Sequence, residues 1–210
     1  SPMASMKMLL NTIMMSVEKD KIDPDIFDML EMSNKTSEEV FSLLDNLLKW
    51  TKSQLGKLTV IPQKLDISGL ADGVVEVMNS VAEVKHIKLI RTDHESFFVY
   101  VDIEMIKSVL RNLISNAVKF SNPDSEIKVG IKAEDGKVIV SVTDSGKGIK
   151  KEDQHKLLKD STHFTTYGTN SEEGSGLGLL LCRDFARKNG GELWFESEEN
   201  LGSVFSFSLP

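Results

Sequence analysis

Three polar residues recur at helical spacing in the stretch RNLISNAVKF. Asn112, Asn116 and Lys119 are separated by four and three positions, which places all three on one face of a helix. Amide oxygens are ligands suited to Mg²⁺, and a lysine ammonium suits phosphate as a point charge. The spacing therefore indicates either a site for a magnesium-bound phosphate or a polar stripe that faces solvent.

An aspartate and two glycines follow in the stretch DSGKGI. Asp144 ends a run in which apolar and polar residues alternate, so we expect it at the end of a strand. There its carboxylate could accept a hydrogen bond from an exocyclic amine of a ligand. Gly146 and Gly148 permit backbone angles or close approaches that a Cβ would forbid. A tight turn that binds nothing is the alternative.

A second glycine cluster, GSGLGL, opens an apolar run. Gly174, Gly176 and Gly178 precede an expected helix, whose first-turn N–H groups are free to bind phosphate. The preceding residues, 159–175, are mostly polar, and we expect them to form a lid. Taken alone, this cluster too could be only a turn.

Alternating strands and helices are expected to position these residues. Segments of alternating hydrophobicity flank Glu134-Asp135-Gly136 and Asn200-Leu201-Gly202, which predicts two hairpins. Ser68 and Asp102 are expected to cap helices, and the second of these helices ends at Phe120. The sequence predicts an α+β fold in which a mostly antiparallel mixed sheet and helices form a two-layer α/β sandwich.

The first part of the chain has the pattern of helices. Apolar residues recur every three or four positions from Met3 to Val17, and Asp23-Pro24 begins a second helix that extends to about Leu55. Two adjacent apolar stripes on that helix predict a four-helix bundle made by two chains, with packing on the same chain as the alternative. We divide the chain into a helical hairpin, 1–61, and a second domain, 62–210.

Composition excludes several classes of protein. The chain has 210 residues and a net charge of -7 without a basic stripe, so nucleic acid is not an expected partner. No apolar run is long enough for a membrane span. The single cysteine, Cys182, excludes an intramolecular disulfide.

The three polar and glycine-rich stretches, in this order, resemble the nucleotide-binding boxes of the histidine-kinase ATP-binding domain. This domain has the Bergerat-type fold of the superfamily that includes DNA gyrase, the heat-shock chaperones and MutL. The resemblance implies that Asn116 binds Mg²⁺, that Asn112 and Lys119 contact phosphates of ATP, and that Asp144 binds the adenine amine. The other nucleotide-binding residues that it implies are Phe120, Gly146, Gly148, Ile149, Phe164, Gly174, Ser175, Gly176, Leu177 and Gly178.

The N-terminal helices resemble the dimerisation and phosphotransfer hairpin of sensor histidine kinases in two-component systems. The resemblance implies a homodimer formed through this hairpin and transfer of the phosphoryl group to an aspartate of a response-regulator receiver domain. It also implies the cytoplasmic portion of a membrane-bound sensor, with any membrane segment upstream.

The opening residues, SPM, resemble the end of the family's H box, in which the phosphoacceptor histidine would precede Ser1. The histidines of the chain are His86, His94, His155 and His163, and none lies on the first expected helix. We therefore expect the chain to bind Mg²⁺-ATP without phosphorylating itself. The alternatives are a chaperone-like clamp ATPase, against which residues 1–55 argue, and a helical module whose nucleotide pocket is only structural.

Overall fold

The computed structural model describes residues 5, 8–9, 12–13, 16, 22–93, 95–158, 168–169 and 176–210. The chain divides into two compact units, residues 1–54 and 55–210, and each is described by itself. The few described residues of the first expected helix are all helical. The boundary predicted near residue 62 lies in the stretch between α2 and β1 that has neither helix nor strand.

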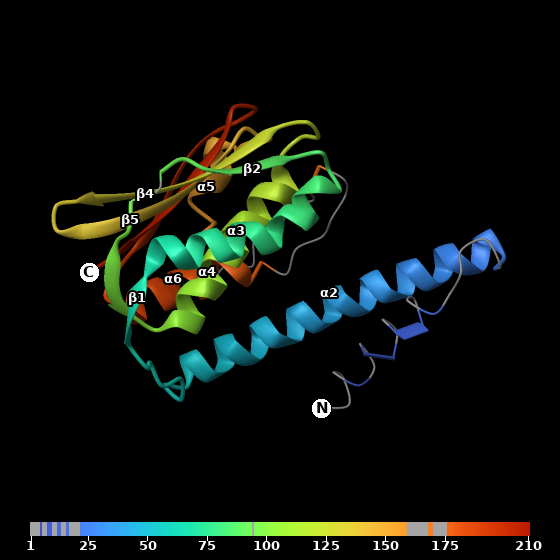
Figure 1. Ribbon diagram of the computed structural model, residues 1–210, viewed down its shortest axis with the longest axis horizontal. Helices are drawn as coiled ribbons and strands as arrows, with labels where there is room; N and C mark the ends of the chain where they lie inside the picture. The colour runs from blue at the N-terminus through green and yellow to red at the C-terminus, as the bar shows by residue number, and fades with distance from the viewer. Residues whose placement is uncertain are drawn as a thin grey trace. The chain divides into compact units, whose positions relative to one another are not determined.

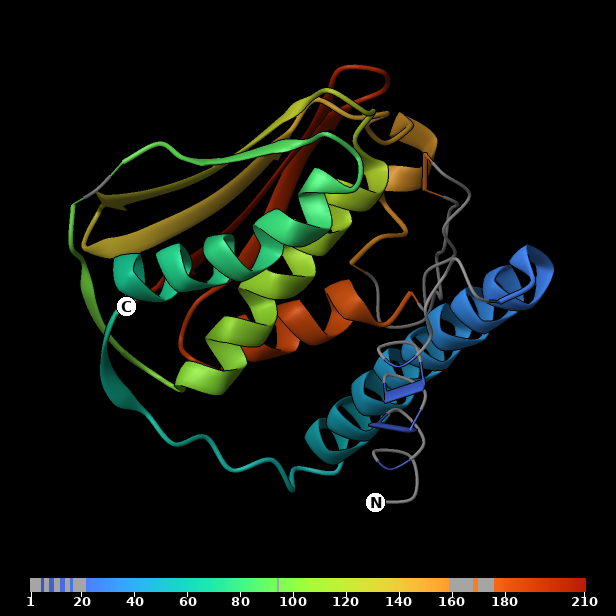
Figure 2. The ribbon, with the colours of Figure 1, turned by 45° about the vertical axis from the view of Figure 1, so that its right-hand side comes forward.

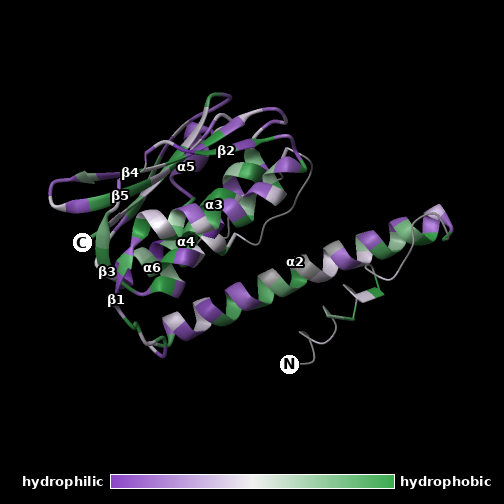
Figure 3. Ribbon diagram, viewed as in Figure 1, coloured by the Kyte–Doolittle hydropathy of each residue, from purple (hydrophilic) through white to green (hydrophobic). Residues whose placement is uncertain are grey.

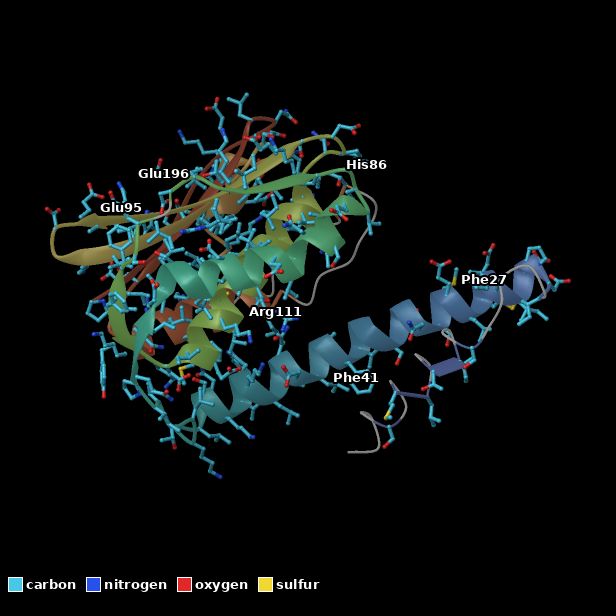
Figure 4. The ribbon with its side chains drawn as sticks, in the orientation of Figure 1. Phe27, Phe41, His86, Glu95, Arg111 and Glu196 are labelled. Carbon is cyan, nitrogen blue, oxygen red and sulfur yellow. The ribbon has the colours of Figure 1, made fainter. Side chains whose placement is uncertain are left out.

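Helix α2, Pro24–Gln54, is the main element of the first unit. It begins as predicted, because Asp23 Oδ1 accepts a hydrogen bond from the Asp25 N–H at 2.9 Å and proline at the first position needs no such partner. Hydrophilic and hydrophobic residues alternate along the helix (Figure 3). Phe27 and Phe41 are labelled on it in Figure 4. Its exposed large apolar side chains include Ile26, Met29, Met32, Val40, Leu43, Leu47 and Leu48.

The second unit contains a five-stranded sheet with the strand order β2-β4-β5-β7-β6. The strands are β2 Lys88–Arg91, β4 Glu126–Glu134, β5 Lys137–Asp144, β6 Leu193–Glu198 and β7 Gly202–Leu209. The first pair, β2 with β4, is parallel and the other pairs are antiparallel. A separate two-stranded sheet joins β1, Gln63–Asp66, to β3, Phe98–Val101. The mixed sheet with helices confirms the predicted α+β fold.

Three helices cover one face of the larger sheet (Figures 1 and 2). They are α3 Ile67–Glu83, α4 Ile103–Phe120 and α6 Gly178–Lys188, and the short α5 spans Lys151–Gln154. The core lies between these layers, where side chains such as Ile114, Leu181 and Phe207 are fully buried. Burial of one such side chain contributes about 1.5–3 kcal/mol. This packing places α4 and α6 against the sheet.

Of the two predicted helix caps, one is correct and one is wrong. Asp102 caps α4, and its side chain accepts a hydrogen bond from the Met105 N–H at 3.1 Å. Ser68 does not cap α3: the helix begins two residues earlier than that prediction requires, and Asp66 accepts a hydrogen bond from the Ser68 N–H. The Ser68 hydroxyl donates instead to the Glu95 carbonyl. Both residue types are good caps, so the tertiary contact decides between them.

Both predicted hairpins are present. Asp135 and Gly136 join β4 to β5 with φ angles of 50° and 74°, the pair of positive angles that a two-residue type I′ turn requires. Asn200, with a φ of 64°, lies in the turn from β6 to β7. These turns fix the register of β5, and therefore the place of Asp144 at its end.

Candidate functional site

Helix α4 carries the row of polar side chains that the sequence predicts. Its other faces bury apolar residues, whereas Asn112, Asn116 and Lys119 are only partly buried. The Asn112 amide donates to the Ser108 carbonyl one turn earlier, at 3.1 Å, which fixes its orientation. The row therefore lies at the border of the core, where its polar groups remain within reach of a ligand.

Asp144 is buried at the end of β5, with 7% of its surface exposed. Its Oδ1 accepts a hydrogen bond from the Gly146 N–H at 2.9 Å. Burial raises the pKa of this carboxyl above the ordinary value of 3.8, and the N–H groups of Gly146 and Ser203 act in the opposite direction. A carboxylate that is buried in this way is suited to accept a hydrogen bond from a ligand that displaces water from the site.

Two glycines after Asp144 are required by close backbone contacts. A Cβ on Gly146 would lie 2.2 Å from the Phe120 carbonyl oxygen, at the end of α4. A Cβ on Gly148, where φ is 60°, would lie 1.9 Å from the Glu198 carbonyl oxygen. These glycines therefore allow the loop after β5 to lie directly against both α4 and the turn after β6.

The loop that follows is fixed by hydrogen bonds to two other elements. The Lys147 N–H donates to the Phe120 carbonyl at 3.1 Å. The Gln154 side chain donates both to the Ile149 carbonyl at 3.0 Å and to the Ser197 carbonyl at 2.9 Å. Gln154 was not predicted as a site residue, because its partners lie far from it in the sequence.

Two ammonium groups lie over the Phe120 ring. Lys119 Nζ is 5.0 Å and Lys147 Nζ 4.8 Å from the centre of this ring. Aromatic rings attract cations at such distances. Positive charge is thus concentrated at the junction of α4 and the first glycine loop. Lys147 lies within the predicted motif, but its residue type alone gave no signal for this contact.

The second glycine cluster begins α6 beside the polar row of α4. Gly176 has a φ of 68°, and the next residue, Leu177, is buried and precedes the helix. A Cβ on Gly178 would lie 3.2 Å from Asn112 Oδ1, so the first residue of α6 lies close to the amide. Phe164, Gly174 and Ser175 lie outside the described residues, as does most of the lid predicted at 159–175.

The structure therefore brings together α4, the loop after β5 and the start of α6. Among the described residues, no three His, Cys, Asp or Glu side chains cluster as they would to hold a metal ion by themselves. No described helix is long and apolar enough to cross a membrane. A buried carboxyl, a row of amides and lysine, and glycines that permit close backbone contacts could together bind a phosphorylated ligand with an amine-bearing base.

This fold and this arrangement are those of a known class of ATPases. Residues 101–210 match the family described as "Histidine kinase-, DNA gyrase B-, and HSP90-like ATPase". The chain belongs to this family.

Two proteins with similar sequences are sensor kinases. The adaptive-response sensory kinase SasA of Crocosphaera subtropica is 31% identical over 215 residues, which cover 100% of this chain and 56% of the relative. The sensor protein EvgS of Escherichia coli K12 is 28% identical over 190 residues, 87% of this chain and 16% of the relative. The chain thus spans only part of the length of the curated relatives that it matches.

Solved structures of histidine kinases have the same fold. The catalytic domain of the histidine kinase ThkA is 32% identical with a TM-score of 0.61, and the match covers 71% of this chain and 95% of that domain. Full-length ShkA in complex with AMPPNP gives a TM-score of 0.71 at 21% identity, over 100% of this chain and 45% of that one. The second likeness concerns the fold alone.

Proposed function

We propose that the chain is the catalytic core of a sensor histidine kinase in a two-component system. It binds Mg²⁺-ATP and transfers the γ-phosphoryl group to a histidine, from which the group passes to an aspartate of a response regulator. The observation that carries the proposal is the buried Asp144 carboxyl, held by Gly146 at the junction with α4. The family and the sensor-kinase relatives support the same function.

The bound base would lie at the loop after β5. Asp144 accepts a hydrogen bond from the exocyclic amine of adenine, and Gly146, Gly148 and Ile149 shape the pocket around the ring. Guanine has a carbonyl at the corresponding position, which a carboxylate repels. The site therefore favours ATP over GTP.

The phosphates would lie between α4 and the start of α6. Asn112 and Lys119 contact them from α4, next to Phe120, and Lys119 contributes a full positive charge. The remaining proposed contacts belong to the second glycine cluster and the predicted lid, namely Phe164, Gly174, Ser175, Gly176, Leu177 and Gly178. The N–H groups in the first turn of α6 suit phosphate, because a helix N-terminus carries partial positive charge.

Asn116 would be the protein's ligand to Mg²⁺. This ion typically keeps several waters and phosphate oxygens and takes few protein ligands, so one amide oxygen next to a triphosphate fits its preferences. When bound, Mg²⁺ offsets the charge of the transferring phosphoryl group. The chain's own residues position the nucleotide, exclude water and direct N–H groups and Lys119 at the phosphates.

The phosphoacceptor is proposed to be a histidine other than the four of this chain. His86 follows α3 and His155 follows α5, so neither lies on a long helix of the first unit. His94 and His163 lie outside the described residues. We expect the 210-residue chain to form no acid-labile phosphate by itself.

Helix α2 is proposed to form the dimer and to contribute to the surface for the response regulator. Met29 and Leu48 are 70% and 60% exposed, so this helix leaves a broad apolar face uncovered. Long helices with such faces are characteristic of bundles that bury them against a second copy.

A calorimetric titration with Mg²⁺-ATP and with Mg²⁺-GTP tests the proposal. We expect saturable binding of ATP and at least about tenfold weaker binding of GTP, a difference of about 1.4 kcal/mol. Absence of saturable ATP binding by the folded chain would leave the pocket as a structural feature only. Steady ATP hydrolysis, with no transfer to a histidine-bearing hairpin supplied in trans, would favour a clamp ATPase.

A further inference from the structure

Lys85 is a buried lysine outside the site described above. It lies in the turn from α3 to β2 and is 7% exposed. The turn is tightly held, because the Ile87 N–H donates to the Ala82 carbonyl and His86 adopts a φ of 57°. His86 is labelled in Figure 4 at this end of the second unit, where α3 and α4 both end. The backbone thus directs the Lys85 side chain toward the end of α4.

The ammonium of Lys85 joins three segments that are distant in the sequence. Its Nζ donates to the carbonyls of Val118 and Lys119, both at 3.1 Å, and to the Thr169 hydroxyl at 2.9 Å. The last carbonyls of a helix have no partner within the helix, so Lys85 satisfies two of them at the end of α4. Burial of an ammonium is costly unless its donors are paired in this way.

Thr169 is bound to the same helix end by its own groups. Its N–H donates to the Lys119 carbonyl at 3.1 Å, and its hydroxyl donates to the Ser121 carbonyl at 2.7 Å while it accepts from Lys85. Thr169 precedes the second glycine cluster by a few residues. The junction of Lys85 and Thr169 therefore connects the end of the polar row on α4 to a residue that precedes the second glycine cluster in the sequence.

The charge of Lys85 also has an electrostatic consequence for the proposed site. The C-terminus of a helix carries a partial negative charge, roughly half an elementary charge. The C-terminal turn of α4 contains Lys119 and Phe120, where the triphosphate is proposed to bind, and a negative helix end would repel it. The Lys85 ammonium, which donates hydrogen bonds to the last carbonyls of α4, offsets that charge. A neutral donor would offset it only in part.

We propose that Lys85 is a positioning residue of the nucleotide site, with Thr169 as its partner. Lys85 fixes the C-terminal turn of α4 and holds Thr169 against it, so that the Lys119 end of the polar row lies in place for the phosphates. The inference rests on the proposed binding of Mg²⁺-ATP. Lys85 thereby contributes to nucleotide affinity although it lies far from the glycine motifs in the sequence.

Calorimetric affinity for Mg²⁺-ATP, measured well below the melting temperature, tests the inference. Lys85→Met keeps the length of the side chain and removes its charge, and we expect it to weaken binding about tenfold, because the negative end of α4 is then no longer offset beside the phosphates. Thr169→Val should also weaken binding, and Thr169→Ser, which restores the hydroxyl, should bind like the wild type. Because both residues share one hydrogen bond, the double variant should lose less than the product of the two single effects.

Lys88→Met is the matched control, since Lys88 is exposed on β2 close by in the sequence. It should bind as the wild type does. If Lys85→Met melts at a lower temperature but binds Mg²⁺-ATP with wild-type affinity, Lys85 is only structural and the inference is wrong. If Lys85→Met does not fold, equal affinity of Thr169→Val and Thr169→Ser overturns it instead. Failure of the wild type and Lys88→Met to bind at all would overturn the proposed function as well.

Discussion

Asp144 combines two properties that oppose each other. Its burial at the end of β5 disfavours the ionised carboxylate, yet the ionised form is the one that accepts a hydrogen bond from adenine most strongly. The N–H groups of Gly146 and Ser203 lower the pKa of the carboxyl but do not reverse the effect of burial. We therefore expect the ionised Asp144 carboxylate to lower the stability of the free protein, while it provides a hydrogen-bond acceptor for a ligand.

This conflict predicts a pH dependence of stability. Because the pKa of Asp144 is raised in the folded state, protonation of its carboxyl stabilises the folded protein relative to the unfolded chain. That contribution is fully present below the ordinary value of 3.8 and is lost as pH rises through the folded pKa. Asp144→Asn does not titrate, so its free energy of unfolding relative to the wild type should rise across this window and then level off.

Urea unfolding of both proteins from pH 3 to pH 7 measures this difference. Asp135→Asn is the control, because Asp135 is exposed in a turn that accepts asparagine equally well. A difference for Asp144→Asn that stays flat with pH, or that falls as pH rises, would show that burial does not govern this carboxyl.

Gly146 offers a second prediction at the scale of one residue. Gly146→Ala would place a Cβ 2.2 Å from the Phe120 carbonyl oxygen, so the loop or the end of α4 must shift. We expect a loss of about 1–3 kcal/mol in the free energy of unfolding, as for other overpacked sites, together with weaker ATP binding. Chemical denaturation and nucleotide titration measure the two effects.

Gly73 in α3 provides the matched glycine. No atom lies within 4 Å of a Cβ built there, so Gly73→Ala should stabilise the protein by about 0.5–1 kcal/mol and leave ATP binding unchanged. Similar behaviour of the two variants would mean that the close approach at Gly146 has no functional importance.

Helix α2 leaves a series of large apolar side chains exposed. Leu47 is 39% exposed and lies in the stripe that predicts a dimer. Leu47→Glu would place a charge in that interface, so sedimentation equilibrium should show a shift from dimer to monomer. Gln54→Glu adds the same charge at an exposed position near the end of the helix and should stay dimeric. A wild-type chain that sediments as a monomer at all concentrations would contradict the proposed dimer.

Much of the second unit is predictable from the sequence because local rules determine it. Asp102 at the start of α4 and the Asp135-Gly136 turn follow from capping and turn chemistry. The Ser68 cap was wrong because Asp66, two residues earlier, is an equally good cap, and only the contact of Ser68 with Glu95 decides between them.

The site is predictable in part at the scale of the whole molecule. The motifs predicted Asn112, Asp144 and Gly178 as site residues; they lie on α4, at the end of β5 and at the start of α6, and their role in nucleotide binding stays a prediction. Local patterns could not indicate that Lys85 caps α4 or that Gln154 holds the loop after β5, since these contacts join residues distant in the chain. Such contacts depend on tertiary packing. Hydrophobic periodicity predicts helices and strands, but it does not predict which distant residues meet.

The proposed function depends most on the binding of the adenine of ATP by Asp144. Calorimetric titration of Mg²⁺-ATP into the wild type and into Asp144→Asn tests it most directly. A charge-assisted hydrogen bond is worth about 1.5–3 kcal/mol, and the neutral amide recovers only part of it. We predict saturable binding by the wild type and an affinity about tenfold lower or worse for Asp144→Asn, with the fold retained by circular dichroism. Equal dissociation constants for the two folded proteins, or no binding by either, would contradict this role of Asp144.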